Sequence, residues 1–161
     1  MNSFEFAINM ELDGEKYYME QAEINKGNEL NAIFIRLAKD EKNHAKIFQN
    51  KLNKLSYELK DNNTLSEFKD VFKGIGDFKN EIKKIPNQLD LYRNALEKEK
   101  QSIELYKKFL SETTDDKEKK IFEYLIKEEE DHFAILDELV LLINHADEWV
   151  ESAEFGIREE F

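Results

Sequence analysis

The sequence contains no cysteine among its 161 residues, and it has only one proline and five glycines. Without cysteine, the chain has no disulfide scaffold, thiolate zinc site, iron–sulfur cluster or thiol nucleophile. Valine and threonine together contribute six residues, whereas β-sandwiches and barrels need β-branched residues and many tight turns. These shortages favour an all-α protein of one domain, built from long helices.

Positive charge is also scarce, because 24 lysines and arginines face 36 acidic residues and the net charge is −12. Such a chain is repelled by nucleic acid and by anionic membrane surfaces, so neither is expected as a partner. The longest apolar run, Leu139–Ile143, is far too short to cross a bilayer. The N-terminus has no basic start followed by an apolar stretch, which predicts a cytoplasmic protein without a secretory signal.

Four segments show the periodicity of helices with one buried face. They are predicted at residues 3–24, 29–59, from about 87 to a turn at 113–116, and 117–146, with Ser3 as the first N-cap. Residues 60–86 are predicted to be a crossover carrying one or two short helices, with a partly disordered loop as the alternative. Residues 147–161 are predicted to be a C-terminal tail that either packs on the bundle or frays. The apolar residues Trp149, Phe155 and Phe161 of this tail could form a dimer interface, so a homodimer is a further prediction.

The chain also contains an internal repeat, because a shift of 88 residues aligns its two halves without a gap. Each half is therefore predicted to be a helical hairpin. The two hairpins, joined by the long crossover, should form a four-helix bundle over residues 1–146. The matched residues are Ala7, Glu11, Tyr18, Ile33, Phe34, Leu37, Lys39, Glu41, His44 and Ile47 with Ala95, Glu99, Tyr106, Ile121, Phe122, Leu125, Lys127, Glu129, His132 and Ile135.

Polar side chains interrupt the apolar stripe of every predicted helix. A buried unpaired carboxylate is costly, so buried charges are paired or bind metal. Several carboxylates converging without cations would repel one another and partly protonate. The six interrupting residues are Glu11, Glu41, His44, Glu99, Glu129 and His132.

The spacing of these six residues places them at one level of the bundle. Glu11 lies 16 residues before the turn at Gly27, and Glu41 and His44 lie 14 and 17 residues after it. The second hairpin repeats these distances around Asp115. At about 1.5 Å per residue, all six side chains reach a level roughly 24 Å from the turns. Within each Glu-x-x-His pair, the two residues share one face of their helix.

Four carboxylates and two imidazoles facing one axis suit two divalent cations, whose charges would neutralise the cluster. Oxygen and nitrogen ligands without sulfur favour iron or manganese, with zinc as an alternative. A single Glu-x-x-His is weak, because glutamate is 25 of the 161 residues and such a pair usually lies on a solvated helix face. The prediction depends on all six residues together. His145 has no repeat mate and is interpreted as a surface or tail histidine.

The pattern resembles the ferritin-like superfamily, and specifically the erythrin domain of the rubrerythrin family. The resemblance covers all four predicted helices. The motifs that carry it are Ala7-x-x-x-Glu11-x-x-Gly14-x-x-x-Tyr18, Glu41-x-x-His44, Ala95-x-x-x-Glu99-x-x-x-x-x-x-Tyr106 and Glu129-x-x-His132. The resemblance implies a carboxylate-bridged di-iron centre. Glu41 and Glu129 would bridge the irons, His44 and His132 would cap them, and Glu11 and Glu99 would complete the ligand set.

Two features depart from that family. Rubrerythrins usually append a rubredoxin domain that needs four cysteines, so electrons here would come from an external donor protein or a small reductant. Full rubrerythrins also carry a further glutamate three residues after the third-helix ligand, where this chain has Ser102, the repeat mate of Gly14. The set resembles the more symmetric six-ligand members of the superfamily.

Two tyrosines, Tyr18 and Tyr106, lie two helical turns after Glu11 and Glu99. Each phenol either hydrogen-bonds a ligating carboxylate and tunes it, or fills the core with its hydroxyl satisfied elsewhere. Tyr17 and Tyr124 lie off the stripe and are predicted to be packing residues.

Three functions follow from this sequence. The first is a di-iron oxidoreductase that reduces peroxide or dioxygen. The second is an iron-binding protein or ferroxidase that handles Fe(II) without sustained peroxidase turnover. The third is a structural bundle whose vestigial or zinc-filled site only stabilises the fold.

Overall fold

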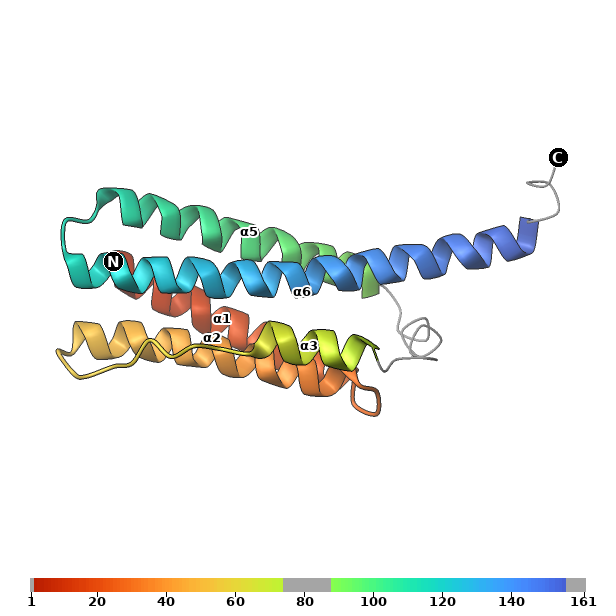
Figure 1. Cartoon of the computed structure of the whole chain (residues 1–161), viewed down its shortest axis with the longest axis horizontal. Coiled ribbons are helices and arrows are strands. Elements are labelled where there is room, and N and C mark those ends of the chain that lie inside the picture. Colours follow the sequence, from red (N-terminus) through yellow and green to blue (C-terminus); the bar gives the residue numbers. More distant parts are fainter. Residues whose placement is uncertain (1, 74–87, 156–161) are drawn as a thin grey trace.

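Two long helical hairpins make up the bundle, which we describe from a computed structural model covering residues 2–73 and 88–155. In the first hairpin α1 (Ser3–Ile24) packs along α2 (Leu30–Leu52), and in the second α5 (Gln88–Glu112) packs along α6 (Asp116–Phe155). A shorter helix, α3 (Thr64–Lys73), lies against α2 and α6 (Figure 1). The described residues contain no strand, and the predicted all-α, ferritin-like bundle of two hairpins is confirmed.

The first helix spans the predicted residues 3–24, but the predicted N-cap is wrong, because the cap is Asn2 and not Ser3. The Asn2 side chain accepts a hydrogen bond from the Glu5 backbone at 2.8 Å, and the Asn2 backbone donates to the Glu5 side chain at 3.4 Å. This reciprocal pair needs a glutamate or glutamine three residues after the cap. Ser3 would place Phe6 at that position, and its side chain accepts no hydrogen bond.

The second helix ends at Leu52, although the periodicity predicted that it continues to residue 59. Asn53 caps it, and Lys54 then adopts a positive φ of 58°, which a right-handed helix does not contain. Leu55, which lies in the part of the predicted helix beyond this end, is 59% exposed. The apolar pattern therefore continued beyond the point where the partner helices could cover it.

The predicted crossover contains one described helix, α3, which buries Phe68 against the bundle. Residues 74–87 of the crossover and residues 156–161 of the tail lie outside the described residues. The backbone of α6 is helical to Phe155, beyond the predicted end at Ala146. The side chains of His145 and Trp149 are not described, so the predictions for them and for a homodimer stay predictions.

The apolar core is divided into two clusters along the bundle. One contains Phe34, Leu37 and Leu136, and the other contains Phe48, Phe122 and Leu125. Between them lie buried polar side chains contributed by all four long helices. No helix of the described chain combines the length and apolarity that crossing a membrane requires.

Candidate metal centre

The six polar residues predicted from the apolar stripes converge inside the bundle. Each is at most 5% exposed. One helix of each hairpin supplies a single glutamate, and the other supplies a Glu-x-x-His pair. The six residues are Glu11 from α1, Glu41 and His44 from α2, Glu99 from α5, and Glu129 and His132 from α6.

The cluster divides into two overlapping groups of four ligand atoms, and within each group all atoms lie within 4.8 Å of one another. One group adds Glu11 and His44 to the shared residues Glu41 and Glu129; the other adds Glu99 and His132 to the same pair. A carboxylate that belongs to both groups can bridge two ions. Glu41 and Glu129 belong to both groups, and the bridging role that the resemblance implied for them stays a prediction.

Each histidine points its Nδ1 atom into the cluster. His44 Nδ1 lies 3.3 Å from Glu11 Oε2 and 3.1 Å from Glu129 Oε1. His132 Nδ1 lies 2.8 Å from Glu41 Oε1. The two rings are stacked with centroids 5.9 Å apart. Both Nδ1 atoms are thus placed to act as ligands.

Two further carboxylates, Asp40 and Glu128, hold the opposite edges of the imidazole rings. Glu128 Oε1 is 3.1 Å from His44 Nε2, and Asp40 Oδ2 is 3.0 Å from His132 Nε2. An ionised carboxylate only accepts hydrogen bonds, so Nε2 carries a proton and donates the hydrogen bond. With Nε2 protonated, Nδ1 is free to bind a cation, and the ring orientation is set from outside the cluster.

The sequence analysis missed these two carboxylates, although a signal for them was present. Asp40 and Glu128 are repeat mates at the 88-residue shift, and each directly precedes a predicted ligand. They are 7% and 5% exposed. An acidic residue that recurs in both halves beside a ligand indicates a shared role, even though its partner histidine lies on another helix.

The electrostatics of the cluster show strong competition for protons. Burial raises the pKa of Glu41 and Glu99 well above the ordinary value, and neighbouring carboxylates add to the shift. Burial also raises the pKa of Glu11. For Glu129, burial acts in the same direction but is outweighed by hydrogen bonds from Glu99 and the two histidines, so its pKa falls well below the ordinary value.

Both histidines favour the protonated, positively charged form of the imidazole. Burial alone would lower the pKa of each imidazole, but the surrounding carboxylates outweigh it and raise the pKa of His44 and of His132 well above 6.5. The protonated imidazoles supply the positive charge that the buried carboxylates need. A cation entering the cluster would take over that role by displacing the protons on Nδ1.

Tyr18 and Tyr106 connect the two hairpins through the cluster. Tyr18 on α1 donates its hydroxyl hydrogen bond to Glu99 on α5, and Tyr106 on α5 donates to Glu11 Oε1 on α1 at 2.5 Å. Both rings are also buried in the apolar core. Each tyrosine therefore fills the core and bonds a predicted ligand at the same time, and the partner is the ligand of the opposite hairpin.

A small cavity of about 210 Å³ opens beside the cluster between α1 and α5. Glu41 and Glu99 line it together with Gly14 and Ser102. A Cβ atom at Gly14 would lie 3.0 Å from Glu41 Oε2, so a larger residue there would press against this carboxylate. The cavity gives a small molecule a path to two of the predicted ligands.

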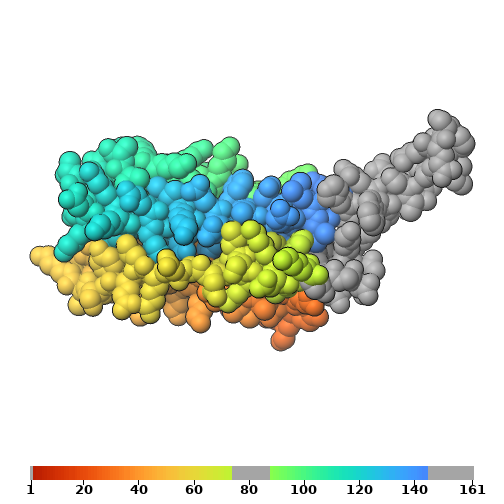
Figure 2. Space-filling model, in the orientation of Figure 1, coloured from red at the N-terminus to blue at the C-terminus, as the bar shows by residue number. Residues whose placement is uncertain are grey.

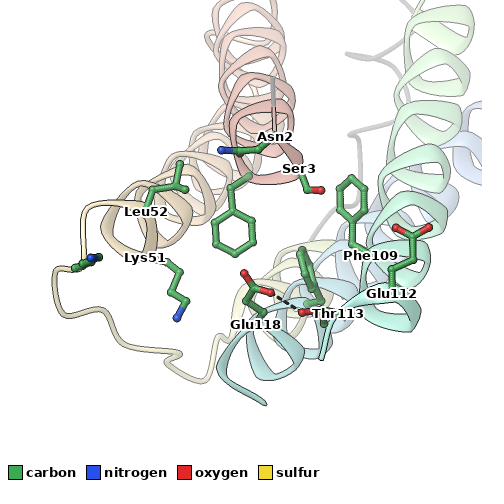
Figure 3. A pocket seen from close by; sticks show the side chains of 11 residues that line it. Asn2, Ser3, Lys51, Leu52, Phe109, Glu112, Thr113 and Glu118 are labelled. Atoms are coloured by element: carbon green, nitrogen blue, oxygen red, sulfur yellow. Dashed lines mark hydrogen bonds between the residues drawn. The ribbon is translucent and has the colours of Figure 1, made fainter. Parts of the chain in front are cut away.

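A larger cavity of about 530 Å³ lies at the end of the bundle, where the start of α1 meets the end of α2 and the α5–α6 turn (Figure 3). Its lining includes Lys51 and Glu118, and Thr113 donates to Glu118 there at 2.5 Å. None of the six predicted ligands, and no histidine, lines this cavity within the described chain. It is therefore separate from the candidate metal centre.

The residues of the cluster fit a pair of divalent cations. Glu99 Oε2 and Glu129 Oε2 are buried without a hydrogen-bond partner. Within residues 2–73 and 88–144, no lysine or arginine forms an ion pair with any of the four glutamates. Carboxylate oxygens lacking donors, beside two imidazole nitrogens, are ligands that iron, manganese and zinc accept. The donor set of the cluster therefore fits a pair of such ions.

Comparison with known proteins gives one match. The family model described as Rubrerythrin matches residues 2–140, which include all six predicted ligands. Curated proteins and solved structures gave no match.

Proposed function

Because the chain belongs to the rubrerythrin family, we propose that it is a di-iron carboxylate protein. In this role it reduces peroxide or dioxygen with electrons from an external donor protein. The observation that carries the proposal is the pair of overlapping four-ligand groups sharing Glu41 and Glu129. Two iron ions bound there would supply the two electrons needed to cleave one O–O bond.

The residues of the cluster would have different roles in binding and orienting the metal ions. Glu41 and Glu129 would hold both ions, and His44 and His132 would each contribute an imidazole ligand to one of them. Asp40 and Glu128 accept hydrogen bonds from the two Nε2 atoms and keep both rings oriented. The apolar clusters on both sides exclude bulk water from this layer, which strengthens the electrostatic interactions inside it.

Peroxide reduction to two waters consumes two protons as well as two electrons. Groups that line the cavity and can hold protons include the hydroxyl of Tyr18, which is bonded to Glu99, and the carboxyl of Glu41, whose pKa burial raises. A cavity of about 210 Å³ admits a peroxide or dioxygen molecule and excludes large organic substrates. These features support a small oxidant as the substrate.

A second candidate, an iron-binding protein or ferroxidase without sustained peroxidase turnover, is favoured by one observation. The position that holds an additional glutamate in full rubrerythrins is Ser102, whose hydroxyl donates to the Lys98 backbone carbonyl at 3.1 Å. A serine bonded in this way offers no carboxylate to exchange at the metals during redox cycling. The ligand set is then fixed at six.

The first experiment measures metal binding directly. Wild-type protein loaded with Fe(II) without oxygen is expected to bind two ions per chain, measured by elemental analysis after desalting. Glu41→Ala and Glu129→Ala remove residues shared by both ligand groups, so both variants are expected to lose stoichiometric metal. Glu130→Ala is the matched control, because Glu130 is exposed beside Glu129 on the same helix. If both shared-ligand variants retain two ions, the ligand assignment is wrong.

A second experiment separates the two candidates. Fe(II)-loaded protein is mixed with peroxide, and with dioxygen, in a stopped-flow spectrophotometer, and a reductant is then added. Repeated oxidation and reduction cycles support the oxidoreductase. A single oxidation followed by release of iron supports the ferroxidase. Absence of oxidation by either oxidant would contradict both and leave a structural metal site.

A further inference from the structure

The segment that leads into α3 lies in the seam between α2 and α6. Tyr124 on α6 donates its hydroxyl hydrogen bond to the Lys60 carbonyl at 2.7 Å. On the other side, Arg36 of α2 donates from Nε to Thr64 Oγ1 at 3.0 Å. In Figure 1 this part of the backbone trace runs along the bundle toward α3, and in Figure 2 α3 lies alongside α6. The segment is thus attached to both hairpins.

Two side chains of this segment reach the carboxylates behind the histidines. Asn62 Nδ2 donates to Glu128 Oε1 at 2.9 Å, and Thr64 Oγ1 donates to Asp40 Oδ2 at 2.7 Å. These are the same two oxygen atoms that accept the hydrogen bonds of the histidine Nε2 atoms. Each histidine is therefore connected through one carboxylate oxygen to the crossover.

The two donors are held in a fixed relation to each other. The Thr64 backbone donates to Asn62 Oδ1 at 2.7 Å, which forms a tight turn at the start of α3. Thr64 is 3% exposed and Asn62 is half-buried, whereas Asn63 between them is exposed. Arg36 also donates to Asn63 Oδ1 at 2.8 Å. These hydrogen bonds hold the turn, which presents its first and third side chains to the bundle.

We propose that Asn62 and Thr64 are positioning residues that hold both metal-facing histidines through Glu128 and Asp40, so that the crossover and the metal centre stabilise each other. The inference rests on the metal-binding function proposed above. One short segment thereby serves both halves of a pseudo-symmetric site. The repeat itself contains no such segment, because residues 62–64 lie between the two hairpins.

The physical consequence is a two-way coupling. Without its donor, each outer carboxylate loses one of the two hydrogen bonds that orient the shared oxygen, so the imidazole becomes freer to rotate away from the metals. Metal that fixes the imidazole from the inside must in turn stabilise the carboxylate and the turn behind it, because such coupling is reciprocal.

The test uses full-length protein loaded with Zn(II), which is redox-inactive, and with Co(II), which reports ligand geometry by its visible spectrum. Asn62→Ala and Thr64→Val are compared with wild type for the rate at which a chelator removes the metal. Loss of a residue that orients a ligand typically weakens binding about 10-fold to 100-fold, and we expect release to be roughly 10-fold faster. The Co(II) spectrum is expected to change in both variants.

Two further variants separate positioning from general stability. Thr64→Ser keeps the hydroxyl donor and is expected to restore slow release. Asp61→Ala removes an exposed side chain of the same segment that forms no hydrogen bond with the outer carboxylates, so it should release metal at the wild-type rate. If Thr64→Val does not fold, Asn62→Ala tests the coupling by itself.

Hydrogen exchange on the wild-type protein provides an independent measurement. Zn(II) loading is expected to slow amide exchange at the start of α3 as well as around the ligands. Unchanged exchange at α3, together with wild-type release rates for Asn62→Ala and Thr64→Val, would overturn the positioning role while leaving the metal site intact. A wild-type chain that binds no metal would instead overturn the proposed function.

Discussion

A carboxylate inside an apolar bundle is stable only when something compensates for its charge. In this protein each buried glutamate of the cluster contacts an imidazole, a phenol or another carboxylate that shares a proton with it. The compensation is completed by residues of a neighbouring helix, as when Tyr106 of α5 donates to Glu11 of α1. At the residue scale, stability and metal binding therefore depend on the same side chains.

Removing one of the crossed hydroxyls should destabilise the metal-free protein. In Tyr106→Phe the buried Glu11 Oε1 loses its donor, and an unsatisfied buried acceptor costs about 1–3 kcal/mol. Urea denaturation should show this loss in the free energy of unfolding. Tyr17→Phe is the control, because its half-buried hydroxyl donates only to the Leu91 carbonyl. Equal losses in the two variants would contradict the special role of the Tyr106 bond.

Each long helix presents an apolar stripe that polar residues interrupt at one level. The positions at which the helix begins and ends determine how much of that stripe is buried. The end of α2 is determined by Lys54, which adopts a left-handed conformation with φ of 58°. The chain then runs back along the seam and delivers Asn62 and Thr64 to the outer carboxylates. A helix continuing to residue 59 would leave too few residues for that return path.

The backbone conformation at Lys54 predicts a stabilising substitution. A non-glycine residue in the left-handed region costs roughly 1 kcal/mol, so Lys54→Gly should raise the free energy of unfolding by about 0.5–1 kcal/mol. Lys46→Gly, at an exposed position inside α2, should lower it by about 1 kcal/mol. Urea denaturation of both variants measures the two effects, and a loss in Lys54→Gly would contradict the prediction.

Across the whole molecule, the polar layer separates two apolar clusters and makes stability sensitive to pH. The histidines and three of the four glutamates have a raised pKa in the folded chain. The folded state therefore binds these protons more tightly than the unfolded state. A group of this kind stabilises the fold below its unfolded pKa and loses that contribution as pH rises through its folded pKa.

The direction of these pKa shifts predicts that pH has opposite effects on the stability of the metal-free protein and on the stabilisation that metal provides. For metal-free protein, the free energy of unfolding should fall as pH rises above 6.5, by at most about 1.4 kcal/mol per pH unit for each retained proton. The lowered pKa of Glu129 does not oppose this, because its contribution is already complete above 4.5. Thermal unfolding followed by circular dichroism between about pH 6 and 8.5 checks the trend.

Metal should reverse the dependence, because its ligands must lose their protons before they bind. The increase in melting temperature caused by Zn(II) is therefore expected to grow with pH over the same range. The chelator-treated protein serves as the reference at each pH. A metal-induced increase that shrinks as pH rises would contradict the proton displacement described for the two Nδ1 atoms.

The sequence by itself determined the bundle, the repeat and the level at which six polar residues meet. These follow from helical periodicity and from residue counts to each turn, which are properties of a single hairpin. Only the tertiary structure decided which residues meet across hairpins: Tyr18 with Glu99, Asp40 with His132, and Asn62 with Glu128. Such contacts depend on how two hairpins and a crossover pack, and no spacing along one helix encodes that geometry.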